Sequence, residues 1–229
     1  MQTSIWLLGL FIAVFFAGAF IMPVREEFRY IHSVPLFEWL KEHPLWITWW
    51  LWGSIGILSV LTINTIFCSI ESIIKKRRSR QWLLIISPQI IHIGFLFLLL
   101  AHLLSSVGGF KGHAVAKEGT FLQIPDSNIA LHIKDIDIQI DKYGFITDWA
   151  VGIEYFSERN MVKNDSISPN NPSLKGGLNI NVRDLTTLPE KTVLLQVSRE
   201  PGALWALIGG ILFMAGTVTL IILKAKLEK

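Results

Sequence analysis

The chain has a single cysteine, Cys68, among 229 residues. One cysteine excludes an intrachain disulfide framework, and it leaves no CxxC motif for redox chemistry or zinc binding. Cys68 lies at the cytoplasmic end of the second of the hydrophobic runs described below. There we expect it to be a small, buried, apolar residue. Thiol chemistry by the chain itself is therefore not expected.

Charged residues are also sparse, and the chain has no Gly-rich phosphate-binding loop, internal repeat or Ser/His/Asp order that would indicate a hydrolase. Charged side chains make up 17% of the residues and give a formal net charge of +3. The basic residues gather in one short run, "KKRRSR" (75–80), between two apolar runs. A basic loop in that position favours a signal for membrane topology over nucleic-acid binding. No nucleic-acid partner is expected.

The chain is rich in apolar residues and tryptophan. Half of its residues are hydrophobic (51%), and nine are tryptophan. Its mean hydropathy is +0.47. Together these values are typical of a membrane protein, with lipid as a partner. Six of the tryptophans lie at or near the ends of hydrophobic runs, where interfacial anchors are expected: Trp46, Trp49, Trp50, Trp52, Trp82 and Trp205.

Four hydrophobic runs are each long enough to span a bilayer core of about 30 Å at about 1.5 Å per residue. We predict transmembrane helices at 1–22, 46–70, 82–107 and 201–223. The first run has neither a basic start nor a convincing cleavage site, so we expect a helix and not a signal peptide.

The basic residues predict the orientation of these helices. Loop 71–81 is basic, and Lys224, Lys226 and Lys229 follow the last helix in the tail 224–229. The positive-inside rule places this loop and both termini in the cytoplasm. The segment 108–200 then lies on the outer side.

The first outer loop, 23–45, mixes aromatic and charged residues. We expect it to lie at the outer membrane face, and Ser33 is a candidate N-cap for a short helix within it.

The outer segment 108–200 shows the period-two alternation of β-strands. The predicted fold class is therefore a membrane protein of α+β type. It has four transmembrane helices and a small antiparallel β-rich extracytoplasmic domain between helices 3 and 4. We expect five or six strands in a sandwich or partial barrel. A phase change between Ile133 and Ile136 indicates a β-bulge, and the turn-rich segment 164–177 is expected to be an exposed loop.

The third helix carries a histidine, His92, near its middle. An ionisable residue within a membrane span is a functional-site hypothesis by default. Gln89 and Pro88 precede His92 by three and four residues, so the three share a helix face. We expect Gln89 to bind one imidazole nitrogen and to leave the other free for iron. Gly94 admits a close neighbour or a flat ligand. Metal or cofactor ligation, hydrogen bonding to an adjacent helix and proton relay all remain open for His92.

The other histidines are weaker candidates. His102 lies ten residues after His92, about 15 Å along the helix axis, so the two cannot ligate one iron. It lies near the outer headgroups, where an imidazole costs little. His113 lies just outside the span and is a candidate for an outer site or a solvent-exposed residue. The remaining three are expected to be ordinary loop or strand residues: His32, His43 and His132.

The order of several segments resembles one known family. They are "GAFIMP" (18–23), "FEWLKEHPLWITWWLW" (37–52), the basic loop, "IIHIGFLFLLLAHLLSSVGGFKG" (90–112), "AKEGT" (116–120) and "REPGALWALIGGILFMAG" (199–216). In this order they resemble the ResB (CcsB) component of System II cytochrome c biogenesis. The external domain, of about 90 residues, is smaller than in many members of the family. The tryptophan-rich haem-handling motif of the partner subunit is absent, because "WWLWG" (49–53) has no Asp.

The resemblance implies a function. The chain would be the B-type subunit of a haem-attachment complex in the bacterial inner (cytoplasmic) membrane or its equivalent. It would help to move haem across the membrane and present it to apocytochrome c. His92 would be an axial ligand to haem b, carried as substrate or ligand, and the family lends His102 no role. The implied partners are a CcsA/ResC-type tryptophan-rich membrane subunit, apocytochrome c and, indirectly, thiol-reducing proteins. The chain would belong to a cytochrome c synthetase of the holocytochrome c lyase type without being catalytic alone.

Two other functions remain open. The chain could be a haem b-binding membrane subunit of a respiratory electron-transfer complex. Its second haem-ligating histidine would then come from another chain, since only the third helix contains any. It could also be a structural membrane subunit without haem, in which His92 joins two helices.

Overall fold

The computed structural model describes residues 2–76, 82–124, 128–157 and 160–227. The chain forms two compact units. Residues 1–109 and 201–229 make up the helical unit, and residues 110–200 make up the β unit. Three basic residues of the predicted cytoplasmic loop, Arg77, Arg78 and Arg80, lie outside the described residues.

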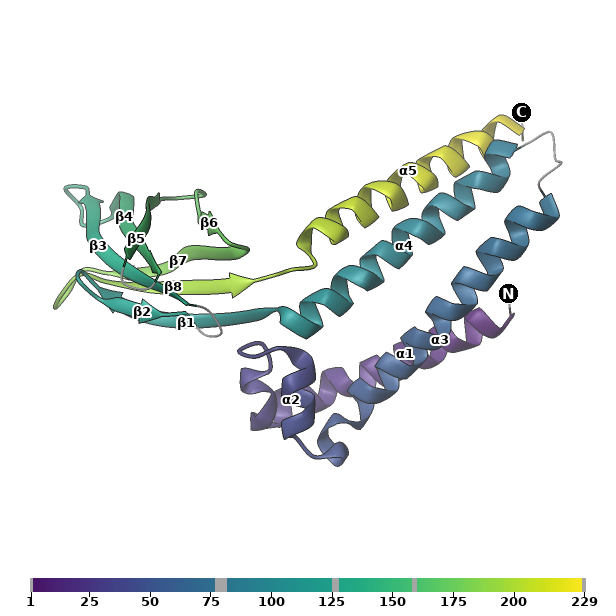
Figure 1. The fold of residues 1–229 in the computed structure, drawn as a ribbon, viewed down its shortest axis with the longest axis horizontal. Helices are drawn as coiled ribbons and strands as arrows, with labels where there is room; N and C mark the ends of the chain where they lie inside the picture. The colour runs from purple at the N-terminus through teal and green to yellow at the C-terminus, as the bar shows by residue number, and fades with distance from the viewer. Residues whose placement is uncertain (1, 77–81, 125–127, 158–159, 228–229) are drawn as a thin grey trace. The chain divides into compact units, whose positions relative to one another are not determined.

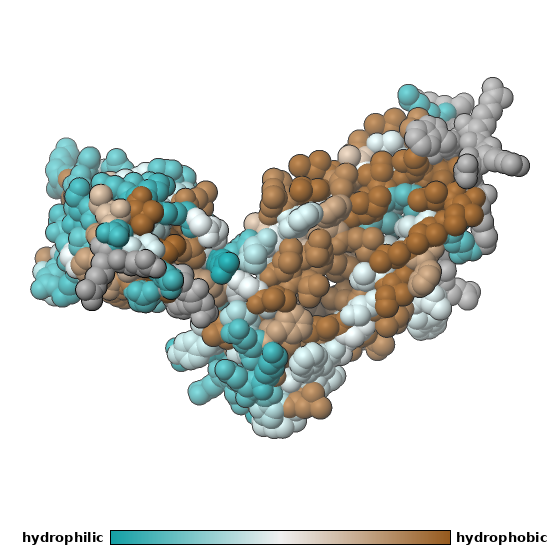
Figure 2. Space-filling model, in the orientation of Figure 1, coloured by the Kyte–Doolittle hydropathy of each residue, from teal (hydrophilic) through white to brown (hydrophobic). Residues whose placement is uncertain are grey.

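Four helices of the helical unit are long and apolar enough to cross a membrane. They are α1 (Gln2–Ile21), α3 (Leu45–Lys76), α4 (Trp82–Gly108) and α5 (Ala203–Leu227). All four coincide with predicted helices, so the chain is a multi-pass membrane-type α+β protein. Helix α3 ends at Lys76, six residues later than the expected end at residue 70. Figure 2 shows mostly hydrophobic residues on the visible face of these helices and mostly hydrophilic ones on that of the β unit.

Three short helices connect α1 to α3: η1 (Met22–Val24), η2 (Glu26–Tyr30) and α2 (Leu36–Glu42). The expected short helix is present, but its N-cap residue is Pro35 and not Ser33. The backbone N–H of Ser33 instead donates to the carbonyl of Tyr30 in a turn. This segment and the start of α3 share a small buried core: Phe28, Ile31, Trp39, Leu40, Ile47 and Trp50.

Helices α4 and α5 lie side by side (Figure 1). Small residues recur at intervals of seven along both segments: Ser87, Gly94 and Ala101 on α4, and Gly202, which directly precedes α5, with Gly209 and Gly216 on α5. A Cβ atom on Gly209 would lie 2.8 Å from the carbonyl oxygen of Gly94. A seven-residue repeat keeps small side chains on one face of a helix, and small side chains let two backbones approach closely. The two helices are therefore packed backbone to backbone along this seam.

The β unit is a sandwich of two four-stranded antiparallel sheets. One sheet has the order β1-β8-β7-β6, and the other has the order β2-β3-β4-β5. The strands are β1 (Phe110–Lys117), β2 (Phe121–Gln123), β3 (Ile129–Ile140), β4 (Ile146–Ser157), β5 (Asn160–Ile167), β6 (Ser173–Lys175), β7 (Leu178–Thr186) and β8 (Thr192–Arg199). Residues of both sheets form its core, among them Ile133, Ile153, Ile180 and Leu195. The expectation of five or six strands was wrong because β2 and β6, with three residues each, are too short to show an alternation.

The predicted phase change in β3 is confirmed. The register between β3 and β4 shifts between Ile133 and Asp135, as a β-bulge requires. The exposed loop predicted at 164–177 was wrong in two places, because residues 164–167 belong to β5 and residues 173–175 form β6. These two are edge strands of their sheets, and an edge strand can form with few apolar side chains.

Candidate functional site

His92 makes a hydrogen bond to a neighbouring helix. Its Nδ1 atom lies 2.9 Å from the hydroxyl oxygen of Ser69 on α3. The side chain is half-buried. Within the described part of the chain, no hydrogen bond to Nε2 is present. When Nδ1 carries the proton and donates it to Ser69, Nε2 is left with a free lone pair.

Gln89 does not make the expected bond to His92. Its side chain is 5% exposed, and its Oε1 atom has no hydrogen-bond partner among the described residues. Ser69 occupies the position beside Nδ1 that was expected for Gln89. Sequence reasoning missed Ser69 because the contact joins two different hydrophobic runs. Its only signal was a hydroxyl within an apolar helix.

Gly94 faces α5 and not the imidazole. A Cβ atom at Gly94 would lie 2.6 Å from the backbone nitrogen of Phe213 on α5. Two residues correspond to a rotation of about 200° on a helix, so Gly94 and His92 lie on nearly opposite sides of α4. Of the two roles expected for Gly94, the structure supports the close neighbour.

The other two histidines expected at a site are exposed. His102 is exposed on α4, and its backbone carbonyl accepts a hydrogen bond from Ser106. His113 is exposed on β1, opposite Gln196 of β8. Among the described residues there is no group of three or more His, Cys, Asp or Glu that could hold a metal ion.

Cys68 is exposed on the surface of α3. The expectation of a buried residue was therefore wrong. Its neighbour Ser69 faces α4 instead, because adjacent helix positions differ in direction by about 100°.

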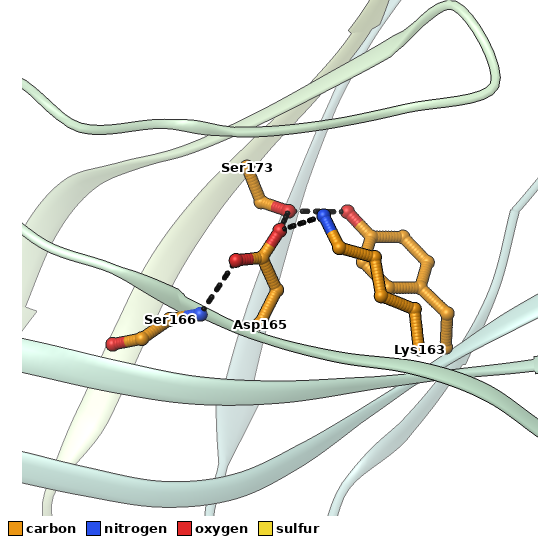
Figure 3. Close-up of polar contacts among 5 residues, drawn as sticks. Lys163, Asp165, Ser166 and Ser173 are labelled. Atoms are coloured by element: carbon orange, nitrogen blue, oxygen red, sulfur yellow. Dashed lines mark hydrogen bonds and ion pairs between the residues drawn. The ribbon is translucent and has the colours of Figure 1, made fainter.

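The β unit contains a hydrogen-bonded network of polar side chains that joins its two sheets (Figure 3). The hydroxyl oxygens of Tyr155 on β4 and Ser173 on β6 lie 2.8 Å apart. Ser173 donates to Oδ2 of Asp165 at 2.6 Å, and Lys163 donates to the same oxygen at 2.6 Å. The backbone N–H of Ser166 donates to Oδ1 of Asp165. Each hydroxyl and carboxylate oxygen of this network has a partner, so the network links the two sheets.

Two pKa shifts follow from this network. The hydrogen bond from Lys163 lowers the pKa of Asp165, and the bond from Ser173 lowers it further. Burial raises the pKa of the Tyr155 phenol. At neutral pH the Asp165 carboxylate is therefore charged and the Tyr155 phenol is neutral.

The chain was compared with protein families, curated proteins and solved structures. No protein-family model matches the chain, and no curated protein matches it. Among solved structures, the cytochrome c haem lyase CcmF is similar to it, with a TM-score of 0.47 and 12% sequence identity. The similarity covers 70% of this chain and 29% of CcmF, so this chain spans less than a third of that protein's length.

Proposed function

We propose that this chain is the B-type membrane subunit of a System II complex that attaches haem to cytochrome c. In this proposal His92 is an axial ligand to haem b on its way across the membrane. The single observation that carries it is the hydrogen bond between Ser69 and Nδ1 of His92, which leaves Nε2 free. The segment order that resembles the ResB family supplies the rest of the assignment.

The residues around His92 suit a haem ligand. A hydrogen bond to one imidazole nitrogen holds the orientation of a ring that binds metal through the other nitrogen. Haem iron needs only one or two axial ligands, so a single imidazole is sufficient on this chain. Gln89, one turn before His92, has a buried acceptor oxygen that could receive a hydrogen bond. The bound haem would supply the iron and the vinyl groups, and this chain would hold and orient it.

The second axial ligand and the attachment step belong to partners in this proposal. A histidine of a CcsA/ResC-type subunit would complete a bis-imidazole site. With both termini in the cytoplasm, the β unit would lie on the outer side and would face the partner subunit or apocytochrome c. Cys68, at the cytoplasmic end of α3, cannot then keep the thiols of apocytochrome c reduced. That task falls to separate thiol-reducing proteins.

The proposal is tested by purifying the chain with its partner and measuring haem by pyridine haemochrome. We expect haem below one equivalent and variable between preparations, as for a molecule in transit. His92→Ala should lose this haem and stop cytochrome c maturation in cells. His102→Ala, which alters an exposed histidine on the same helix, is the matched control and should keep both.

Two results would contradict this assignment. Full haem content with normal maturation in His92→Ala would exclude His92 as the ligand. A stoichiometric haem that is reduced by quinol would instead favour a respiratory electron-transfer subunit.

A further inference from the structure

The β unit contains a histidine, His132, that makes a hydrogen bond to a carboxylate. His132 on β3 lies directly opposite Glu154 on β4. Its Nδ1 atom is 3.0 Å from Oε2 of Glu154. The two side chains keep 21% and 17% of their surface exposed, respectively. The pair therefore lies at the surface of the sheet β2-β3-β4-β5, partly shielded from solvent.

Two aromatic rings flank this imidazole. The ring of Phe121 on β2 stacks on His132 at 4.2 Å between centroids. The ring of Phe156 on β4 meets His132 edge-on at 6.1 Å. Phe121 is 61% exposed, and Met161, the direct partner of Phe156 on β5, is 58% exposed. The imidazole thus has exposed apolar side chains beside it.

The hydrogen bond to Glu154 determines which nitrogen of His132 is available. A carboxylate accepts hydrogen bonds and cannot donate them when it is ionised, so Nδ1 carries the proton. In the neutral imidazole Nε2 then keeps its lone pair, and it has no hydrogen-bond partner among the described residues. A carboxylate behind an imidazole also makes the far nitrogen a better metal ligand.

The surroundings of His132 select the kind of ligand. A bare metal ion needs several protein ligands, and the described residues contain no group of three or more His, Cys, Asp or Glu that could provide them. A haem brings four nitrogen ligands of its own and needs an axial ligand from the protein. Its flat, largely apolar ring also suits a surface lined by aromatic side chains.

We propose that His132 is an axial ligand of a second haem site, on the outward face of the sheet β2-β3-β4-β5. Phe121, Phe156 and Met161 provide apolar contacts to the macrocycle, and Glu154 is a positioning residue that acts through His132. Binding forms one bond from Nε2 to iron and displaces a weak axial ligand such as water. No electron is transferred, and the proton on Nδ1 stays in place. The inference rests on the proposed function in one respect, which is that haem reaches the side of the membrane where the β unit lies.

The test uses the full chain in lipid nanodiscs, titrated with haemin and followed by the Soret band. The four proteins compared are the wild type, His92→Ala, His132→Ala and the double variant. Empty nanodiscs correct for haemin dissolved in lipid. His32→Ala removes an exposed histidine of the helical unit and is the matched control. We expect two sites in the wild type and in His32→Ala, one in each single variant and none in the double variant.

The outcomes separate the two assignments. If His132→Ala binds haemin like the wild type, and His92→Ala and the double variant each lose one site, the His132 site is excluded while the His92 site stands. If His92→Ala binds like the wild type but His132→Ala loses one site, the His92 ligand fails and the His132 site stands.

His132→Ala could lose haemin simply by misfolding. Glu154→Gln, which keeps the shape of the side chain, is therefore a second test. It should keep the imidazole-ligated spectrum and bind haemin about 10-fold more weakly, which is the effect typical of losing a carboxylate behind a ligating histidine. Unchanged affinity in Glu154→Gln, together with unchanged haemin binding in His132→Ala, would overturn the proposal.

Discussion

Ser69 and His92 are 23 positions apart in the chain, yet the hydroxyl of Ser69 on α3 lies 2.9 Å from Nδ1 of His92 on α4. This contact has two consequences. It adds a polar bond between two otherwise apolar helices, and such bonds are worth about 0.6–2 kcal/mol in membranes. It also holds the imidazole in an orientation in which Nε2 has no hydrogen-bond partner among the described residues.

Ser69→Ala tests the second consequence. Without the hydroxyl, the ring of His92 loses its orienting partner, so haem should bind about 10-fold more weakly while keeping a histidine-ligated spectrum. Haemin titration of the purified chain measures the loss. Ser59→Ala is the control, because Ser59 lies on the same helix and its hydroxyl donates to the carbonyl of Ile55 within α3. Equal affinities for Ser69→Ala and the wild type would show that Ser69 does not position His92.

Gly209→Ala tests the packing of α4 against α5. The new Cβ atom would lie 2.8 Å from the carbonyl oxygen of Gly94 and 2.9 Å from the backbone nitrogen of Leu98, so the two helices would have to move apart. Overpacking of this kind costs about 1–3 kcal/mol.

The neighbouring Gly210 is the matched control for Gly209, since a Cβ atom there meets nothing within 4 Å. Gly210→Ala should leave the melting temperature in detergent unchanged or raise it slightly through helix propensity, whereas Gly209→Ala should lower it. Equal melting temperatures for the two variants would contradict the backbone contact.

Tyr155→Phe tests the link between the two sheets. The phenol is fully buried and shares a hydrogen bond with Ser173. Its removal should cost about 1–2 kcal/mol. Hydrogen exchange of the strands β4 and β6 should become faster. The same change at the exposed Tyr143 should leave exchange in both strands as it is in the wild type, and an equal effect of both variants would argue against the link.

Asp165 predicts a pH dependence for the β unit. Its folded pKa is lowered, first by Lys163 and then by Ser173, relative to about 3.9 in an unfolded chain. A lowered pKa contributes stability that is fully present above the unfolded value. This contribution is lost as the pH falls through the folded value.

Acid unfolding of the wild type and of Asp165→Asn provides the measurement for this pH dependence. The asparagine variant should be less stable at neutral pH and should lose less stability on acidification. Lys163→Met should also make the β unit lose less stability on acidification, because it removes the largest cause of the lowered pKa of Asp165. If acidification weakens Asp165→Asn as much as the wild type, the carboxylate is not responsible.

Some of the candidate site could be predicted from sequence because it depended on local properties. His92 was evident as an imidazole within an apolar run. The bulge after Ile133 was evident because a change of phase along one strand is itself a sequence pattern. Gln89 was the wrong partner for the imidazole, since sharing a helix face does not establish a hydrogen bond.

By itself, the sequence determined the four apolar helices, the position of the β unit between the third and fourth, and the histidine within the third. These follow from hydropathy and from periods of two and 3.6 residues, which are properties of short stretches of chain. The tertiary structure alone decided that Ser69 meets His92, that Gly94 packs on Gly209 and that His132 is held by Glu154. Each of these pairs joins segments that are distant in sequence. Their contact depends on the register between neighbouring helices or strands, and that register is set by the packing of many side chains at once.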